Sequence, residues 1–227
     1  MTTSGDNSFP SRLTKIDDLT RKHHTFLNVT DECFFFGEYS ARKGFDHSPT
    51  NQLIFNFKKP MRMRNSPGWH YKNRAIKETS AAFPKILRSR LADITLVPVP
   101  PSKWKTDSDY DDRMMDMLRA LQAPSGIKPD IHELIIQTQT MRASHESEAR
   151  LKPAELEAVY EIDEALIQPY PTWIGVIDDV LTTGAHFRAM SIVLKKKFPA
   201  ARITGLFIAR CVPEAIDWKE MFSPINE

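Results

Sequence analysis

The sequence predicts an α/β protein whose central sheet is mostly parallel and flanked by helices. From residue 93 onward, short apolar runs alternate with helix-length amphipathic stretches, which is the order typical of α/β folds. Residues 173–177 are apolar on both alternations, as a central parallel strand buried on both faces requires. A second apolar run at residues 203–209 follows one helix length later, so the two runs and the helix between them form a β-α-β unit.

The first half of this predicted core begins with an apolar strand over residues 94–99. A helix that starts near Asp109 comes next, because four apolar side chains recur at i, i+3, i+4 and i+7: Met114, Met117, Leu118 and Leu121. Residues 131–136 make a second strand candidate. The polar residues 137–152 show no apolar period, so we expect them to form a long mobile loop.

The second half of the predicted core contains two helices and two strands. Pro153 opens a short helix that runs through Tyr160, since proline is favoured at the first position of a helix. After the strand at 173–177, a packed helix face is marked by four apolar side chains: Phe187, Met190, Leu194 and Phe198. With the strand at 203–209, residues 93–212 form one core unit.

The residues before this core are expected to form an arm and a small hood. Residues 1–29 are polar around a proline and show no sustained period, which predicts a flexible arm. Two aromatic, β-prone runs at 32–39 and 52–57 are joined by a turn-rich stretch and predict a hairpin. A helix over 71–91 follows, so the hood is β-rich, and residues 30–92 belong with the core to a single domain over residues 30–227.

Composition and charge exclude several classes of protein. Of the 227 residues, 41% are hydrophobic, which is enough for a core and argues against wholesale disorder. A net charge of +2 is too small for a non-specific attraction to nucleic acid or to an acidic membrane. Cys33 and Cys211 are the only cysteines, so neither a disulfide framework nor a four-cysteine zinc site is expected. Without an apolar signal peptide or membrane span, the sequence predicts a soluble, cytoplasmic protein.

The strongest functional signal lies between Val176 and His186. An apolar strand ends there in two adjacent carboxylates, Asp178 and Asp179, and a small hydroxyl-bearing turn then opens a helix. Free amide groups and the dipole at a helix start suit a phosphate, whereas carboxylates would accept hydrogen bonds from a sugar diol. A helix cap would explain one such Asp, but two adjacent carboxylates after an apolar strand are hard to bury without a partner.

A phosphorylated ribose meets both demands of this segment. The residues expected to hold its 5-phosphate are Val180, Leu181, Thr182, Thr183, Gly184, Ala185 and His186. The segment is neither a nucleotide-binding P-loop, because Gly-Lys-Ser/Thr is missing, nor a dinucleotide site, because no Gly-x-Gly-x-x-Gly occurs.

The segment resembles the 5-phosphoribosyl-1-pyrophosphate (PRPP) binding motif of type I phosphoribosyltransferases, in which two acidic and two aliphatic residues precede Thr-Thr-Gly. His186 departs from that motif, because the family usually has Thr or Ser there. A looser resemblance over about residues 30–212 is to the ComF-like branch related to amidophosphoribosyltransferases. The zinc-binding cysteines common near the N-terminus of that branch are missing here.

The resemblance implies a phosphoribosyltransferase-like fold and a role for further residues. Asp178 and Asp179 would be catalytic, holding the ribose diol. The pyrophosphate would lie against the loop after the strand at 94–99, with three residues assigned to it: Ser102, Lys103 and Arg113. A flexible lid would carry Arg142, His145 and Arg150, and the hood would offer three aromatic side chains to an acceptor base: Phe35, Tyr39 and Trp69.

The resemblance also implies an activity: transfer of a 5-phosphoribosyl group from PRPP to a nitrogen nucleophile, with release of pyrophosphate and with Mg²⁺ as cofactor. No residue is assigned as a metal ligand. The sequence does not identify the acceptor, and it leaves open whether the protein forms a homodimer. One alternative is a regulatory module that binds PRPP or a nucleotide without turnover. Another is a ComF-like accessory protein in DNA uptake or phage defence, with residues 58–64 contacting nucleic acid.

Overall fold

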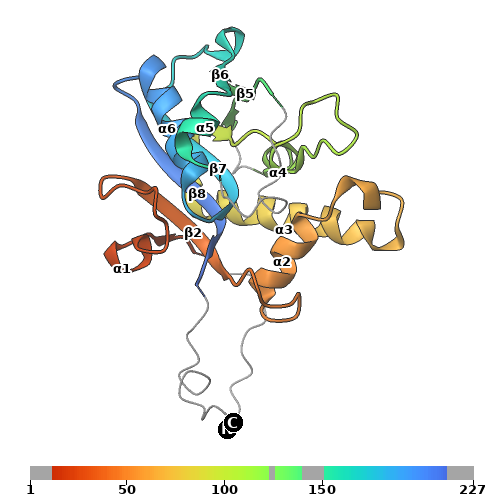
Figure 1. Ribbon diagram of the computed structural model, residues 1–227. Helices are drawn as coiled ribbons and strands as arrows, with labels where there is room; N and C mark the ends of the chain where they lie inside the picture. The colour runs from red at the N-terminus through yellow and green to blue at the C-terminus, as the bar shows by residue number, and fades with distance from the viewer. Residues whose placement is uncertain (1–11, 123–125, 140–150, 214–227) are drawn as a thin grey trace.

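The computed structural model describes residues 12–122, 126–139 and 151–213 (Figure 1). Its larger sheet has six strands in the order β1-β2-β8-β7-β3-β4. Every neighbouring pair from β2 to β4 is parallel, and only β1 pairs antiparallel with β2. The strands are β1 (Thr14–Lys15), β2 (Glu32–Tyr39), β8 (Arg202–Cys211), β7 (Trp173–Leu181), β3 (Thr95–Pro98) and β4 (Asp130–Ile131). The predicted α/β class with a mostly parallel sheet is therefore confirmed.

Helices cover both faces of this sheet (Figure 1). On one face lie α2 (Pro49–Phe57), α3 (His70–Leu87) and α4 (Arg113–Arg119), and on the other lie α5 (Pro153–Glu157) and α6 (Ala185–Lys197). The buried side chains form two clusters accordingly, and β7 contributes to both, with Val176 on the α6 side and Ile177 on the opposite side. Burial on both faces is why residues 173–177 are apolar at every position.

The core helices follow the predicted apolar spacing. The face of α6 marked by Phe187, Met190 and Leu194 is buried, and Phe198 is buried directly after the helix. Met114, Met117 and Leu118 are buried on α4, although that helix begins at Arg113 rather than near Asp109. Four 3₁₀ segments complete the helical part: η1 (Met61–Met63), η2 (Pro67–Trp69), η3 (Arg88–Ala92) and η4 (Glu164–Leu166).

The predicted strand over residues 131–136 is divided in two. β4 ends at Ile131, where His132 turns to contact the Asp130 carboxylate at 2.6 Å and the Leu166 carbonyl at 2.7 Å. The chain then leaves the main sheet, and β5 (Ile135–Gln137) pairs antiparallel with β6 (Tyr160–Ile162). Because Tyr160 begins β6, the helix predicted from Pro153 stops earlier, as α5. The predicted loop at 137–152 lies mostly outside the described residues.

The hood is not β-rich, and the predicted hairpin is wrong. Residues 49–57 form α2, because Ser48 accepts a hydrogen bond from the Asn51 amide as N-cap and Pro49 takes the first helical position. The helix buries an i, i+3, i+4, i+7 face made of Thr50, Leu53, Ile54 and Phe57. The aromatic run at 32–39 does form a strand, but β2 joins the main sheet beside β8. The helix predicted over 71–91 is confirmed as α3, followed by η3.

The predicted flexible arm does not include residues 12–29. The buried side chain of Ile16 and the short helix α1 (Asp18–Arg21), which Asp17 and Thr20 cap reciprocally, give this segment a defined structure. Leu27 is also buried. Residues 1–11 of the predicted arm lie outside the described residues. Among the helices of the described ranges, none has both the length and the apolar character needed to cross a membrane.

We expect Ser48→Ala to destabilise the protein by about 1 kcal/mol, because the substitution removes the side-chain acceptor that caps α2. Ser48→Asp keeps such an acceptor and should stay close to the wild type. Urea unfolding followed by circular dichroism would measure both. Equal stabilities for the alanine and aspartate variants would contradict the assigned cap.

Candidate functional site

The predicted site lies at the carboxyl edge of the sheet, where the connections from two neighbouring strands run in opposite directions. β3 and β7 are neighbours, with Val97 opposite Val176. β3 continues through α4 to β4 on one side, while β7 continues through α6 to β8 on the other. In open α/β sheets, ligands bind in the crevice outside the strand ends at such a switch point. The loop after β3 and the turn after β7 both emerge at this place.

The turn after β7 needs its glycine. Gly184 has a φ of 86°, in the left-handed region, and serves as the N-cap of α6. A Cβ atom on Gly184 would lie 2.9 Å from the Leu27 Cδ2 atom. The backbone conformation and the close approach of Leu27 therefore both favour glycine here.

His24 and Phe26 bind backbone carbonyls of this turn, which we call the phosphate turn (residues 182–186). The Phe26 amide donates to the Thr183 carbonyl at 2.9 Å, and the His24 ring donates from Nδ1 to the Thr182 carbonyl. The Gly184 carbonyl accepts from the Arg188 amide at 2.9 Å, as the first hydrogen bond of α6. In the described ranges, the backbone amides of residues 183–186 donate no hydrogen bond. The carbonyls of residues 182–184 are thus engaged, while the amides have no acceptor among the described residues, as is usual at the start of a helix.

The two carboxylates at the end of β7 have different surroundings. Asp179 is buried and accepts from Arg113 Nε at 3.0 Å and Nη2 at 2.7 Å, while Lys58 Nζ lies 3.0 Å from its other oxygen. Although burial opposes its charge, Lys58 and Arg113 hold the pKa of Asp179 well below its ordinary value. Asp179 is therefore an ionised carboxylate that is already neutralised by the protein.

Further charged groups stand behind Arg113 and complete what we call the Asp179 network (Lys58, Lys72, Asp111, Arg113 and Asp179). Arg113 Nη1 lies 2.9 Å from the Asp111 carboxylate, and Lys72 Nζ lies 2.7 Å from the same oxygen. The Lys72 ammonium also donates to the carbonyls of Phe57 and Lys59, at 2.9 and 3.0 Å. Burial lowers the pKa of Lys72, while Asp111 opposes that shift. The network connects the end of α2, α3, the start of α4 and β7.

Asp178 has no cation within ion-pair distance in the described part of the chain. One of its oxygens accepts a hydrogen bond from the Asp179 amide at 2.8 Å. Burial, together with the neighbouring Asp179 carboxylate, raises the pKa of Asp178 to about 7. Asp178 is therefore the carboxyl group of the pair that can accept new hydrogen bonds from a ligand.

The three residues predicted to bind pyrophosphate lie in two different places. Ser102 and Lys103 lie together in the loop after β3, where the Ser102 carbonyl accepts from Gln137 Nε2 at 2.9 Å. Lys103 is half-buried and makes no ion pair within the described ranges. Arg113, by contrast, forms ion pairs with Asp179 and Asp111, so it belongs to the Asp179 network. Beside the loop lies a cavity of about 150 Å³.

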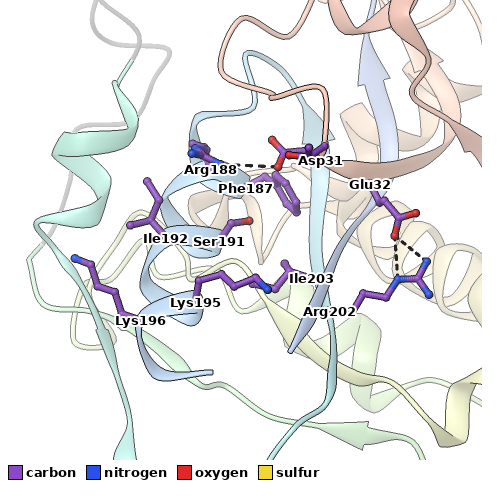
Figure 2. A pocket seen from close by; sticks show the side chains of 11 residues that line it. Asp31, Glu32, Phe187, Arg188, Ser191, Ile192, Lys195, Lys196, Arg202 and Ile203 are labelled. Atoms are coloured by element: carbon purple, nitrogen blue, oxygen red, sulfur yellow. Dashed lines mark hydrogen bonds and ion pairs between the residues drawn. The ribbon is translucent and has the colours of Figure 1, made fainter. Parts of the chain in front are cut away.

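Figure 2 shows the larger of these two cavities, which has a volume of about 690 Å³. It is lined by α6 and by the amino-terminal ends of β2 and β8, the opposite edge from the phosphate turn. Its charged side chains already have partners: Arg202 binds Glu32 at 2.7 Å, and Arg188 lies 3.9 Å from Asp31 (Figure 2). None of the predicted site residues lines it.

The hood aromatics do not form a common base-binding surface. Phe35 is buried in the core on the α6 side, whereas Tyr39 lies half-buried at the end of β2. Trp69 is half-buried and lies under the Lys72 ammonium, 5.5 Å from the ring centroid. The lid residues Arg142, His145 and Arg150 lie outside the described residues.

Sequence reasoning missed Lys72, Asp111 and His24 as residues that surround the site, and it placed Lys58 in another role. A lysine in a predicted amphipathic helix looks solvated, and Asp111 belongs to a polar run of acidic residues. The one available signal was the pair of carboxylates itself, because a buried Asp179 requires cations from elsewhere. Within the described ranges, no group of three or more His, Cys, Asp or Glu side chains could hold a metal ion.

No family model matches this chain, and neither does any curated protein. A functional assignment therefore depends on the geometry of the site and on its motif.

We expect Asp111→Asn to destabilise the protein by about 3 kcal/mol, because it leaves Lys72 buried without the carboxylate it contacts. The matched control is Asp112→Asn, which affects a pair with the half-exposed Arg119 at 2.9 Å and should cost less than about 1 kcal/mol. Urea unfolding of both variants measures the difference. Similar losses for the two would show that the Asp179 network adds no special stability.

Asp178 should make the stability of the folded protein fall as the pH rises. In the unfolded chain an Asp loses its proton near pH 4, whereas folded Asp178 keeps its proton until about pH 7. Between these values the folded state binds one more proton, so its stability decreases with rising pH in this window. The Asp178→Asn variant lacks this decrease.

The measurement is urea unfolding of the wild type and the Asp178→Asn variant at several pH values. The stability of the variant relative to the wild type should increase from pH 5 to pH 7 and then stay level. Parallel profiles across this range would contradict a raised pKa for Asp178.

Proposed function

We propose that this chain is a phosphoribosyltransferase: it binds PRPP and transfers the 5-phosphoribosyl group to a nitrogen nucleophile, releasing pyrophosphate. One observation carries this proposal. The Thr182 and Thr183 carbonyls accept hydrogen bonds from His24 and Phe26, and the amides of residues 183–186 donate none in the described ranges, directly after a strand that ends in two carboxylates. A ligand with a phosphate on one side and a diol on the other fits this order of groups.

The two carboxylates have separate roles in the proposed reaction. Asp178 accepts hydrogen bonds from the ribose hydroxyls, because it is the carboxyl group without a cation partner in the described ranges. Its ionised form also stabilises the positive charge that develops on the ribose ring as the bond to pyrophosphate breaks. Asp179 holds Arg113 and Lys58 in place beside the site. The sequence had assigned the diol to both.

The departing pyrophosphate requires positive charge on the other side of the crevice. Lys103, half-buried in the loop after β3, is available for it, and Ser102 is fixed beside it through Gln137. Mg²⁺ prefers oxygen ligands, which the substrate itself supplies, and Asp178 is the carboxylate of this site that could add one. When bound, the ion would neutralise charge on the pyrophosphate.

The position of Lys58 favours this proposal over contact with nucleic acid. Lys58 is the first cation of the basic segment 58–64, and its ammonium is directed to Asp179 at 3.0 Å. That cation is therefore neutralised within the protein and contributes little to binding a phosphate backbone. A regulatory protein that binds PRPP without turnover would use the same site, so turnover has to be measured.

The test is release of pyrophosphate from PRPP and Mg²⁺ with a panel of purines, pyrimidines and ammonia as acceptors. We expect turnover with at least one acceptor, and we expect Asp178→Asn to lower kcat/KM about 100-fold by removing charge stabilisation of the transition state. The matched control is Asp163→Asn, which replaces the carboxylate that caps η4 and should keep wild-type activity.

The outcome of this assay distinguishes the enzyme from the two alternatives. Tight PRPP binding without turnover for any acceptor would favour the regulatory alternative. Absence of PRPP binding, in a protein whose circular dichroism shows it folded, would contradict the proposal. Binding of DNA that weakens steeply with salt would support the accessory role instead.

A further inference from the structure

Tyr160 and His186 make a direct contact beside the phosphate turn. The Tyr160 hydroxyl lies 2.7 Å from His186 Nδ1, and the two rings are tilted by 34°. Tyr160 begins β6 and is 4% exposed, while His186 is the second residue of α6. The contact therefore joins the small two-stranded sheet to the helix that starts at the proposed phosphate site.

The direction of this hydrogen bond follows from the partners that each ring has. Burial and the nearby Asp178 raise the pKa of Tyr160, so its hydroxyl keeps its proton. His186 Nδ1 is the only partner of that hydroxyl in the described ranges. If Nδ1 carried the ring proton, the Tyr160 hydroxyl proton would be buried without an acceptor. The hydroxyl therefore donates to Nδ1, and the proton of the neutral imidazole is on Nε2.

The neutral His186 ring has one remaining hydrogen-bond donor, its Nε2–H group. Burial lowers the pKa of His186 to about 4, so the imidazole is neutral near pH 7. Side chains lean toward the N-terminal end of their helix, which for His186 is the end at the phosphate turn. Part of the residue still reaches the surface, and it belongs to the phosphate turn, in which the amides of residues 183–186 donate no hydrogen bond in the described ranges. An Nε2–H group on this ring would have no acceptor among the described residues, so it would be available to a ligand of the turn.

We infer that Tyr160 is a positioning residue that holds His186 with its proton on Nε2, as a hydrogen-bond donor to the 5-phosphate of the ribose. The inference rests on the proposed function and extends it to a residue that the motif does not contain. It also gives a physical reason why His186 can stand where the resembled family usually has a hydroxyl. An imidazole can replace a hydroxyl donor only when one of its two nitrogens is fixed as the donor.

The first test compares the wild type with Tyr160→Phe, which removes only the hydroxyl. Titration calorimetry with ribose 5-phosphate should show about tenfold weaker binding in the variant, the size of one hydrogen bond to a charged group. Nitrogen-15 spectra of the histidine rings should place the His186 proton on Nε2 in the wild type and show a mixture of the two neutral tautomers, Nδ1–H and Nε2–H, in the variant. Urea unfolding of the variant confirms that it is folded.

A second variant separates positioning from a general loss of structure. His186→Gln has a side-chain amide that donates without any tautomer, so adding Tyr160→Phe to it should leave the affinity for ribose 5-phosphate unchanged. Tyr110→Phe is the matched control. This variant removes a phenol oxygen that lies 3.3 Å from Asp112 and has no hydrogen-bond partner in the phosphate turn among the described residues, so it should bind like the wild type.

The outcomes distinguish this inference from the proposed function. If the wild type fails to bind ribose 5-phosphate, the proposed function and this inference both fail. If the wild type binds it and Tyr160→Phe binds equally well, only the role of Tyr160 is overturned. A wild-type His186 ring with its proton on Nδ1 would likewise overturn the inference alone.

Discussion

A carboxylate buried at the end of β7 has to be neutralised, and the elements around it are arranged to do so. Asp179 receives Arg113 from α4 and Lys58 from the end of α2. Arg113 in turn shares Asp111 with Lys72, whose ammonium also binds the last carbonyl groups of the α2 region. Breaking one partner of a buried pair is strongly unfavourable, so this network fixes how three helices meet the central sheet.

This constraint also explains why two neighbouring carboxylates behave differently. Successive residues of a strand point to opposite faces, so Asp179 meets the cations of one helical layer, while Asp178 lies near Tyr160, on the side of α6. One group is ionised and occupied, and the other holds its proton until about pH 7 and is open to a ligand. The pair thus combines an ion-paired carboxylate with one that has no cation partner among the described residues.

The phosphate turn shows a similar dependence on distant parts of the chain. Its conformation requires Gly184, but its orientation depends on His24 and Phe26, more than 150 residues earlier in the sequence, which bind the turn carbonyls. The segment that supplies them has no apolar period, and we predicted it to be flexible. A regular apolar period reveals a helix or strand face, whereas His24 and Phe26 reach the turn through hydrogen bonds, which leave no such period in the sequence.

The sequence by itself determined the parallel α/β core and the position of the motif, because burial on both faces leaves continuous apolar runs and a strand-turn-helix transition leaves local signals. The prediction of a strand at residues 52–57 was wrong, because we gave the β-prone aromatic side chains more weight than the helix-capping signal of Ser48 and Pro49. Only the tertiary structure decided which cations reach Asp179, which carboxyl group has no cation partner in the described ranges, and which residue contacts the His186 ring. Those choices depend on contacts between residues far apart in the chain, and electrostatic interactions act through space rather than along the sequence.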